Sequence, residues 1–212
     1  MASFGRPTLL VVGAGFLGRE VAGEACAGGW EVIPVVRSAE SATLLRADFP
    51  RVMVADALNP DFWNGLPAGV ESLVWAVAPS RFCSEEDFEA MQRKGAVAAA
   101  AWAGGKGIPF VYLSSTSVYA EDGGAWVDEG SPVAAEDPRS MAMVEAEQAC
   151  LRVGGTVLRC AGLYGKGREL RPETEGPERW LNLIHGKDAA RAVGIALRQK
   201  RTILNACEDE PR

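Results

Sequence analysis

The sequence lacks most of what metal-binding, disulfide-bonded or membrane-spanning proteins require. It has a single histidine, His185, so a metal site built on histidines is not expected. The five cysteines are scattered without any C-x-x-C pair, and an odd number among small or apolar neighbours indicates reduced thiols. The longest apolar run, Ala96 to Ala103, is far too short to cross a bilayer, and no N-terminal stretch has a signal-peptide layout. We expect a cytoplasmic protein that binds no metal.

An excess of positive charge is also missing. The chain carries 22 lysines and arginines against 28 aspartates and glutamates, a net charge of -6. This balance argues against nucleic acid or an anionic membrane as a partner, so an anionic ligand would need a local positive site. A length of 212 residues with 48% hydrophobic and 24% charged residues is typical of one globular domain, residues 1–212. The oligomeric state stays open.

What is present is an alternation of short apolar runs with helical patterns. Such alternation predicts an α/β fold with a doubly wound parallel sheet covered by helices on both faces. The predicted strands are Thr8–Val12, Glu31–Val36, Val52–Ala55, Ser72–Ala78, Pro109–Ser114 and Thr156–Cys160. The predicted helices are Phe16–Ala27, Ala39–Asp48, an alanine-rich helix from Ser84 to about Gly104–Gly105, Pro138–Arg152, and Ala189–Arg198 with Asp188 as its cap.

A glycine motif lies between the first predicted strand and the first helix. Residues Gly13-Ala14-Gly15-Phe16-Leu17-Gly18 read G-x-G-x-x-G. The first glycine permits a tight turn, the second lets the backbone approach a pyrophosphate, and the third lets helix and strand pack closely. In this strand-turn-helix context the motif predicts dinucleotide binding of the Rossmann type, with the phosphates at the helix N-terminus.

The end of the second strand bears on the choice of cofactor. An NAD-binding protein usually has a carboxylate there, which accepts from the ribose hydroxyls. This sequence reads Val35-Val36-Arg37-Ser38 instead. Arg37 and Ser38 could hold a 2'-phosphate, so we expect NADP as cofactor with NAD as second choice. The alternative is that Arg37 is a solvated surface arginine.

A string of further segments occurs in a family order. The fingerprint is followed by Asp56, Ala76-Val77-Ala78, Ser114 to Tyr119 (SSTSVY), Leu158 to Gly165 (LRCAGLYG), Leu183 to Asp188 (LIHGKD) and Leu204 to Pro211 (LNACEDEP). Together these segments resemble the extended short-chain dehydrogenase/reductases, and most of all the NAD-dependent epimerase/dehydratase-like proteins. The resemblance covers nearly the whole chain.

The resemblance implies roles for particular residues. Gly13, Gly15, Phe16, Leu17 and Gly18 would clamp the nucleotide. Asp56 would face the adenine, and Ala76, Val77 and Ala78 would face the cofactor ribose. Ser115 matches the catalytic Ser/Thr of the family, which hydrogen-bonds the substrate oxygen; the alternative is a hydroxyl that only caps the end of the fifth strand.

The sequence departs from the family at the catalytic helix. The family uses Tyr-x-x-x-Lys, in which a tyrosine with a lowered pKa exchanges the proton. Aligning Glu147 with the acidic residue four places after that lysine puts Arg139 and Met143 in the two positions. Arginine cannot replace the tyrosine, because guanidinium does not give up a proton near neutral pH. The usual acid-base pair is therefore missing.

Two functions fit this pattern. The first is an NADP-dependent oxidoreductase or epimerase-like enzyme acting on a small polar or nucleotide-linked substrate, with Ser115, Glu121 or Asp122 as weak candidates for the chemistry. The second is a non-catalytic dinucleotide sensor or scaffold.

The C-terminal part is expected to form a small, reduced substrate lobe with elements from 165–212. Relatives carry several dozen further residues beyond this point, so either the sequence is truncated or the lobe is small. The segment Gly165–Arg179 is a predicted binding loop. Arg168, Arg171 and Arg179 could meet a substrate phosphate there, although each is more often an exposed charge. His185 is expected to order the neighbouring loop.

Overall fold

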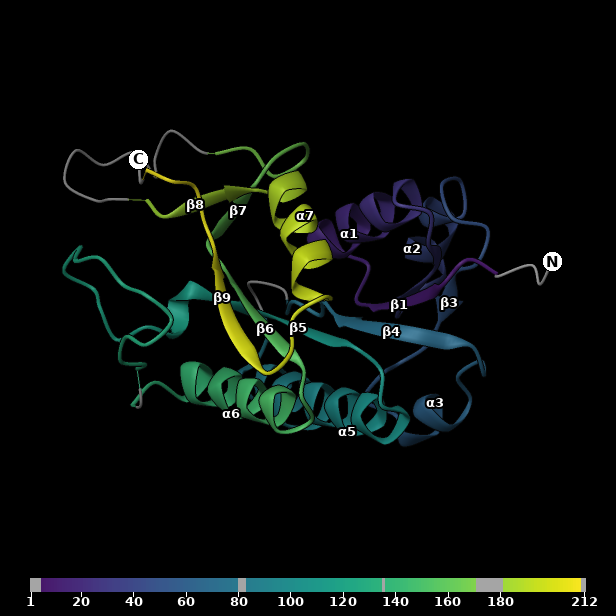
Figure 1. Ribbon diagram of the computed structural model, residues 1–212, viewed down its shortest axis with the longest axis horizontal. Helices are drawn as coiled ribbons and strands as arrows, with labels where there is room; N and C mark the ends of the chain where they lie inside the picture. The colour runs from purple at the N-terminus through teal and green to yellow at the C-terminus, as the bar shows by residue number, and fades with distance from the viewer. Residues whose placement is uncertain (1–4, 80–82, 135, 171–180, 211–212) are drawn as a thin grey trace.

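A central sheet of seven parallel strands carries the structure (Figure 1). The computed structural model describes residues 5–79, 83–134, 136–170 and 181–210. In spatial order the strands are β3 (Met53–Val54), β2 (Glu31–Val36), β1 (Thr8–Val12), β4 (Val70–Trp75), β5 (Phe110–Ser115), β6 (Thr156–Cys160) and β9 (Thr202–Ala206). A separate parallel pair is formed by β7 (Gly162–Tyr164) and β8 (Leu183–His185).

Helices cover both faces of the sheet, which confirms the predicted fold class (Figure 1). One face holds α1 (Phe16–Ala27), α2 (Ala39–Leu45) and α7 (Gly186–Ala196). The other holds α3 (Pro60–Asn64), α5 (Val97–Lys106) and α6 (Pro138–Arg152). A short α4 (Glu85–Glu89) and a π-helical segment, η1 (Ala90–Ala96), lead directly into α5.

The continuous apolar runs of the strands are explained by burial on both faces. In β1, Leu9 and Val11 join the hydrophobic cluster under α1 and α7, while Leu10 and Val12 join the cluster under α5 and α6. All four side chains are at most 1% exposed.

The chain order reverses between β1 and β4, and this reversal places the glycine loop. From β1 the chain proceeds outward through β2 to β3, and then returns to add β4 on the other side of β1. Ligands of doubly wound sheets bind at the carboxyl ends of the strands beside such a switch point. The loop after β1 is anchored there by the N–H groups of Gly13 and Ala14, which both donate to the carbonyl oxygen of Val35 at 3.1 Å.

The alanine-rich helix ends later than the sequence predicted. It begins as expected, with Ser84 Oγ accepting from the N–H of Asp87 at 3.0 Å, but it continues to Lys106. Gly104 stays helical because it packs against Val153, where a Cβ would lie 2.8 Å from Cγ1. Gly107, with φ +66°, supplies the left-handed cap that ends the helix.

Other element boundaries also differ from the expectations. The fourth strand ends at Trp75 rather than Ala78, because the chain turns so that Val77 lies against Gly13. The second helix ends at Leu45 instead of Asp48. Three strands, β7, β8 and β9, were not predicted, and β9 extends the sheet beyond the six expected strands.

The cap of α7 was assigned to the wrong residue. The helix spans Gly186–Ala196, and its N-cap is His185, whose Nδ1 accepts from the N–H of Lys187 at 3.2 Å. Asp188 lies inside the first turn of the helix, and its Oδ1 forms an ion pair with Arg191 Nη1 at 2.9 Å. His185 therefore orders the helix start itself.

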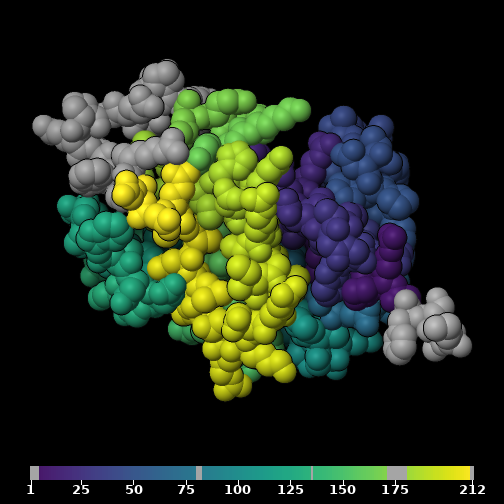
Figure 2. All heavy atoms as spheres, turned by 45° about the horizontal axis from the view of Figure 1, so that its top comes forward, coloured from purple at the N-terminus to yellow at the C-terminus, as the bar shows by residue number. Residues whose placement is uncertain are grey.

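Two helices that are far apart in sequence lie side by side on one face. Figure 2 shows α7 against α1, which begins at the glycine loop.

Within the described ranges, no helix is long and apolar enough to cross a membrane.

Candidate functional site

The three glycines of the loop are needed for different reasons. Gly13 has φ +93°, and a Cβ there would lie 2.6 Å from the backbone nitrogen of Val77. A Cβ on Gly18 would lie 2.2 Å from the carbonyl oxygen of Gly13. A Cβ on Gly15 would meet no protein atom within 4 Å. Packing within the protein therefore requires Gly13 and Gly18, whereas Gly15 leaves an open space at the surface of the loop.

The open side of Gly15 fits a diphosphate. Gly15 is the N-cap of α1, and no side chain makes a capping hydrogen bond there. The first turn of α1 also contains no acidic residue. Free N–H groups and the positive end of the helix dipole are thus available to an anion, with Phe16 and Leu17 as the first helical residues.

The residues after β2 and β3 lie at the same edge of the sheet. Arg37 is exposed and makes no ion pair with any residue in the described part of the chain. Ser38 is the N-cap of α2 and accepts from the N–H of Ser41 at 3.2 Å, so its oxygen already has a structural role. Asp56 accepts from the N–H of Leu58 at 3.0 Å and is exposed.

The segment after β4 closes against the glycine loop. The N–H of Ala76 donates to the carbonyl oxygen of Val12 at 2.8 Å, and Val77 contacts Gly13. Ala78, the next residue, is exposed. The structure therefore brings Ala76 and Val77 to the glycine loop, as the resemblance implied.

Ser115 ends β5 and caps the short 3-10 helix η2 (Thr116–Val118). Its Oγ accepts from the N–H of Ser117 at 3.1 Å. The hydroxyl makes no donated hydrogen bond to any residue that the structure describes. The cap therefore fixes the hydroxyl and leaves its hydrogen available to a ligand, so the structural and functional interpretations are compatible.

The positions aligned with the family's tyrosine and lysine hold side chains of another kind. Arg139 stacks on the ring of Phe88, with the guanidinium carbon 5.2 Å from the ring centroid, and Nη2 donates to the carbonyl oxygen of Cys83 at 3.5 Å. Met143 is only 8% exposed and packs with Phe88 and Val118. An apolar cluster thus surrounds Met143, the residue that the sequence analysis aligned with the lysine of the family.

The tyrosines of the chain are all engaged elsewhere. Burial, and then the charge of Glu147, raise the pKa of Tyr112 well above its usual value, and its hydroxyl donates to Gln92 Oε1 at 2.6 Å. Tyr119 donates to Asn205 Oδ1 at 2.7 Å. Tyr164 is hydrogen-bonded to Glu208. None of the three lies on α6, so none replaces the missing acid.

The weak acid-base candidates are turn residues. Glu121 Oε1 accepts from the N–H groups of Gly123 at 2.7 Å and Ala125 at 3.1 Å, which uses the carboxylate to hold its own loop. Asp122 is exposed. In the same loop, the side chain of Trp126 is 83% exposed.

A buried ion pair joins α6 to β6 next to the end of β5, and the sequence analysis did not identify it. Glu147 on α6 accepts from Arg159 Nε at 3.0 Å and Nη2 at 2.6 Å, and from Ser114 Oγ at 2.6 Å. Both charged side chains are at most 4% exposed. Both residues entered the sequence analysis, because Arg159 lies in the family segment Leu158 to Gly165 and Glu147 was the reference point for aligning the catalytic helix, but spacing alone does not pair them.

Arg159 also connects the loops at the strand ends. Its guanidinium carbon lies 4.8 Å from the ring centroid of Tyr119, whose hydroxyl reaches Asn205 on β9. The N–H of Asn205 in turn donates to Glu129 Oε1 at 2.7 Å. The ends of β5, β6 and β9 are thereby held in one network.

We predict that Glu147→Gln destabilises the fold by about 3–5 kcal/mol, because the Arg159 charge then remains buried without compensation. Arg159 Nη1 already has no hydrogen-bond partner among the described residues. Urea denaturation measures the loss. The matched control is Glu145→Gln on the same helix, where the ion pair with Arg93 is largely exposed and the expected loss is below about 1 kcal/mol. Equal urea midpoints for the two variants would contradict the assignment.

Comparison with known proteins supports the geometry. The model of the family described as "NAD dependent epimerase/dehydratase family" matches residues 9–202. No curated protein matches. Among solved structures, a functionally unknown conserved protein from Silicibacter pomeroyi DSS is 28% identical, with a TM-score of 0.69 over 97% of this chain and 73% of that one. A protein from Methylobacillus flagellatus, provisionally described as an NAD-dependent epimerase/dehydratase, is 27% identical, with a TM-score of 0.74 over 97% and 77%.

A third structure shares the fold at lower identity. The dTDP-glucose 4,6-dehydratase from Bacillus anthracis, in complex with NAD, is 18% identical, with a TM-score of 0.80 over 97% of this chain and 76% of that one. The family match covers most of the chain and includes the glycine loop and the segment aligned with the catalytic helix. This chain belongs to the NAD-dependent epimerase/dehydratase family.

Proposed function

We propose that the chain binds a nicotinamide dinucleotide across the carboxyl edge of its sheet, and that it binds NADP in preference to NAD. The observation that carries the proposal is the open space at Gly15, beside two glycines that the fold itself requires. A side chain at Gly15 would disturb nothing in the protein, so the space suits a ligand that must touch the backbone.

The preference for NADP rests on the end of β2. No carboxylate stands at Val36 or Arg37 to accept from ribose hydroxyls and to repel a 2'-phosphate. The guanidinium of Arg37 is exposed and has no ion-pair partner within the described residues, so it can make a charge-assisted contact. Ser38 contributes less, because its oxygen caps α2.

The substrate is proposed to be a small polar or nucleotide-linked molecule. A nicotinamide cofactor supplies hydride transfer when bound. The hydroxyl of Ser115 is held by the N–H of Ser117 and can donate to a substrate oxygen at the end of β5. The β7–β8 pair and the start of α7 provide the nearby lobe elements.

The five free cysteines support a reducing, cytoplasmic compartment, and burial raises the pKa of Cys150 and of Cys160 to about 12.

A specific observation favours a second candidate, a dinucleotide sensor without turnover. Met143 lies in an apolar cluster and Arg139 stacks on Phe88, so the tyrosine and lysine positions offer no proton relay. Cofactor binding does not depend on that pair, because the glycine loop lies on different elements.

Gly15→Val is expected to abolish dinucleotide binding while the fold persists, because the added methyl groups occupy the space of the pyrophosphate. Calorimetric titration of the folded variant measures the affinity. Gly23→Val is the matched control, since Gly23 lies in the same helix and a Cβ there also meets no atom within 4 Å. Unchanged affinity in Gly15→Val would remove the basis of the proposal.

Arg37→Ala is expected to erase most of the NADP preference and to leave NAD affinity nearly unchanged. Charge-assisted hydrogen bonds contribute roughly 1.5–3 kcal/mol, or on the order of 10- to 150-fold in affinity. The preference should shrink as salt rises, because the arginine is exposed. Arg46→Ala, at the opposite end of α2, serves as control. Equal affinity of the wild type for both cofactors at low salt would contradict the NADP assignment.

Turnover of nucleotide sugars or aldehydes is expected to be slow, with kcat below about 0.1 s⁻¹. Loss of acid-base assistance typically costs about 10²–10⁴-fold, here taken from a median enzyme kcat of about 10 s⁻¹. Absorbance at the reduced nicotinamide band follows the reaction. Residual activity should fall in Ser115→Ala and persist in Ser117→Ala. Fast turnover that survives Ser115→Ala would contradict the sensor candidate and the role given to Ser115, and would point to another acid-base residue.

A further inference from the structure

A pocket of about 210 Å³ opens where the first turns of α1 and α7 meet. Its walls are formed by Phe16, Glu20, Gly165, Lys166, His185, Gly186 and Lys187. The two helices pack against one another along this face (Figure 2). Phe16 belongs to the glycine loop, so the pocket borders the proposed dinucleotide site on the ring side of this residue.

The charge around this pocket is mostly positive. Lys166 and Lys187 line it, and the guanidinium carbon of Arg168 lies 5.6 Å from the ring centroid of Phe16. None of these three cations forms an ion pair with any residue in the described part of the chain. Glu20 is the single acidic residue in the wall. All three are exposed, and in a chain of net charge -6 this local excess of cations favours an anionic ligand.

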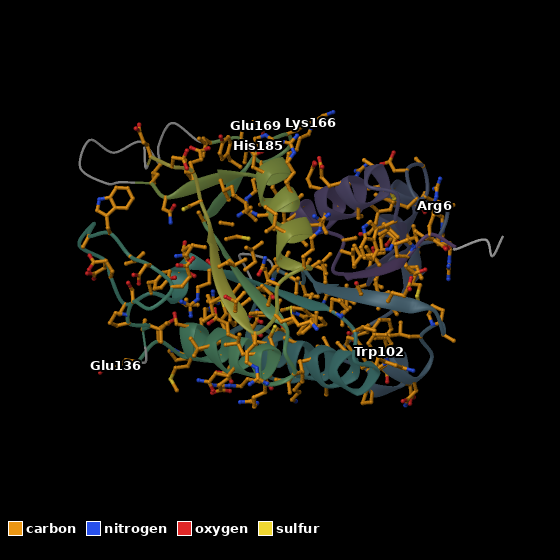
Figure 3. The ribbon with its side chains drawn as sticks, viewed as in Figure 1. Arg6, Trp102, Glu136, Lys166, Glu169 and His185 are labelled. Carbon is orange, nitrogen blue, oxygen red and sulfur yellow. The ribbon has the colours of Figure 1, made fainter. Side chains whose placement is uncertain are left out.

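Two further carboxylates, Glu169 and Asp188, form no ion pair with the lysines in the described part of the chain, and Asp188 pairs with Arg191 instead. Figure 3 shows Glu169 close to Lys166 and His185. Its Oε1 accepts from the N–H of Gly167 at 3.0 Å and so stabilises its own turn. This hydrogen bond lowers the pKa of Glu169, which therefore stays ionised while it holds the loop that presents Lys166.

His185 adds a positioned donor to the same wall. Its Nδ1 accepts from the N–H of Lys187, so the proton of the neutral ring is on Nε2. The ring stands edge-on to Tyr164 at 5.2 Å between centroids. Gly165, with φ +147°, lets the chain pass this ring, because a Cβ there would lie 3.1 Å from Nε2.

We propose that this pocket binds the phosphoryl group of a small molecule, in a site separate from that of the cofactor diphosphate. Lys166 and Lys187 would supply the charge, and His185 a hydrogen bond. The positive ends of α1 and α7 act in the same direction. The pocket shares Phe16 with the proposed nucleotide clamp, but its other walls are Glu20 of α1, the start of α7 and the loop after β7, whereas the dinucleotide cradle is the backbone at Gly15. This inference goes beyond the proposed function, since it does not require the cofactor.

Titration with inorganic phosphate tests the site in the full chain, followed by the amide signals of Gly186 and Lys187 in two-dimensional NMR. We expect saturable shifts with Kd on the order of 1 mM. The double variant Lys166→Met, Lys187→Met should bind at least about tenfold more weakly. Lys94→Met, Lys200→Met is the matched control, because it removes the same charge from exposed positions elsewhere. Circular dichroism checks that each variant is folded.

Glu20→Gln is expected to change the phosphate affinity in the opposite direction. Removal of the single acidic wall residue should tighten phosphate binding several-fold, which a damaged fold does not produce. Equal phosphate affinity in both lysine pairs, or no gain in Glu20→Gln, overturns the proposal.

A last arm separates this site from the cofactor site. Phosphate should bind with the same affinity when the dinucleotide is saturating, and Gly15→Val should leave phosphate binding intact. Displacement of phosphate by the dinucleotide means that the pocket belongs to the cofactor, and this outcome also overturns the proposal. Failure of dinucleotide binding itself would appear in calorimetry and leaves the phosphate test unaffected.

Discussion

The close approach of the chain after β1 to the chain after β4 is the constraint on which the rest of the site depends. Gly13 lies against the backbone of Val77, and Gly18 lies against the carbonyl oxygen of Gly13. Neither contact leaves room for a side chain. These contacts place the start of α1 at the switch point of the sheet, between β1 and β4. The N-terminus of α1 therefore faces the edge formed by the carboxyl ends of the parallel strands.

A second, independent support lies under the opposite half of the site. The buried pair Glu147–Arg159 joins α6 to β6 and, through Ser114, to β5. Tyr119, Asn205 and Glu129 extend this network to the loops. The network ties Ser114, the residue before Ser115, to Glu147 in the second half of α6.

In the proposed function, dinucleotide binding and chemistry would depend on different elements of the fold. The dinucleotide elements depend on backbone geometry at β1, β4 and α1. The chemistry would depend on side chains at the end of β5 and along α6. A phosphoryl site beside Phe16 would lie on yet another set of elements, α1 with α7 and the loop after β7, so its occupation can change without a change in either half.

The sequence by itself determined the alternating α/β architecture and the position of the glycine loop. Continuous apolar runs such as Thr8–Val12 and a G-x-G-x-x-G between strand and helix are local signals. A strand buried on both faces and a tight turn each require particular residue types at consecutive positions of the chain. The sequence also predicted that the tyrosine and lysine of the family are missing, from the residues at Arg139 and Met143. It failed at the end of the alanine-rich helix, since the need for Gly104 comes from contact with Val153, far away in the chain.

Only the tertiary structure decided which distant residues act together. It paired Glu147 with Arg159, assigned the cap of α7 to His185 rather than Asp188, added β9 to the sheet, and gathered Lys166, Lys187 and Arg168 around Phe16. Each of these depends on the packing of elements separated by many residues. Periodicity and spacing report the environment of a residue along the chain, whereas an ion pair or a pocket is fixed by which elements meet in space.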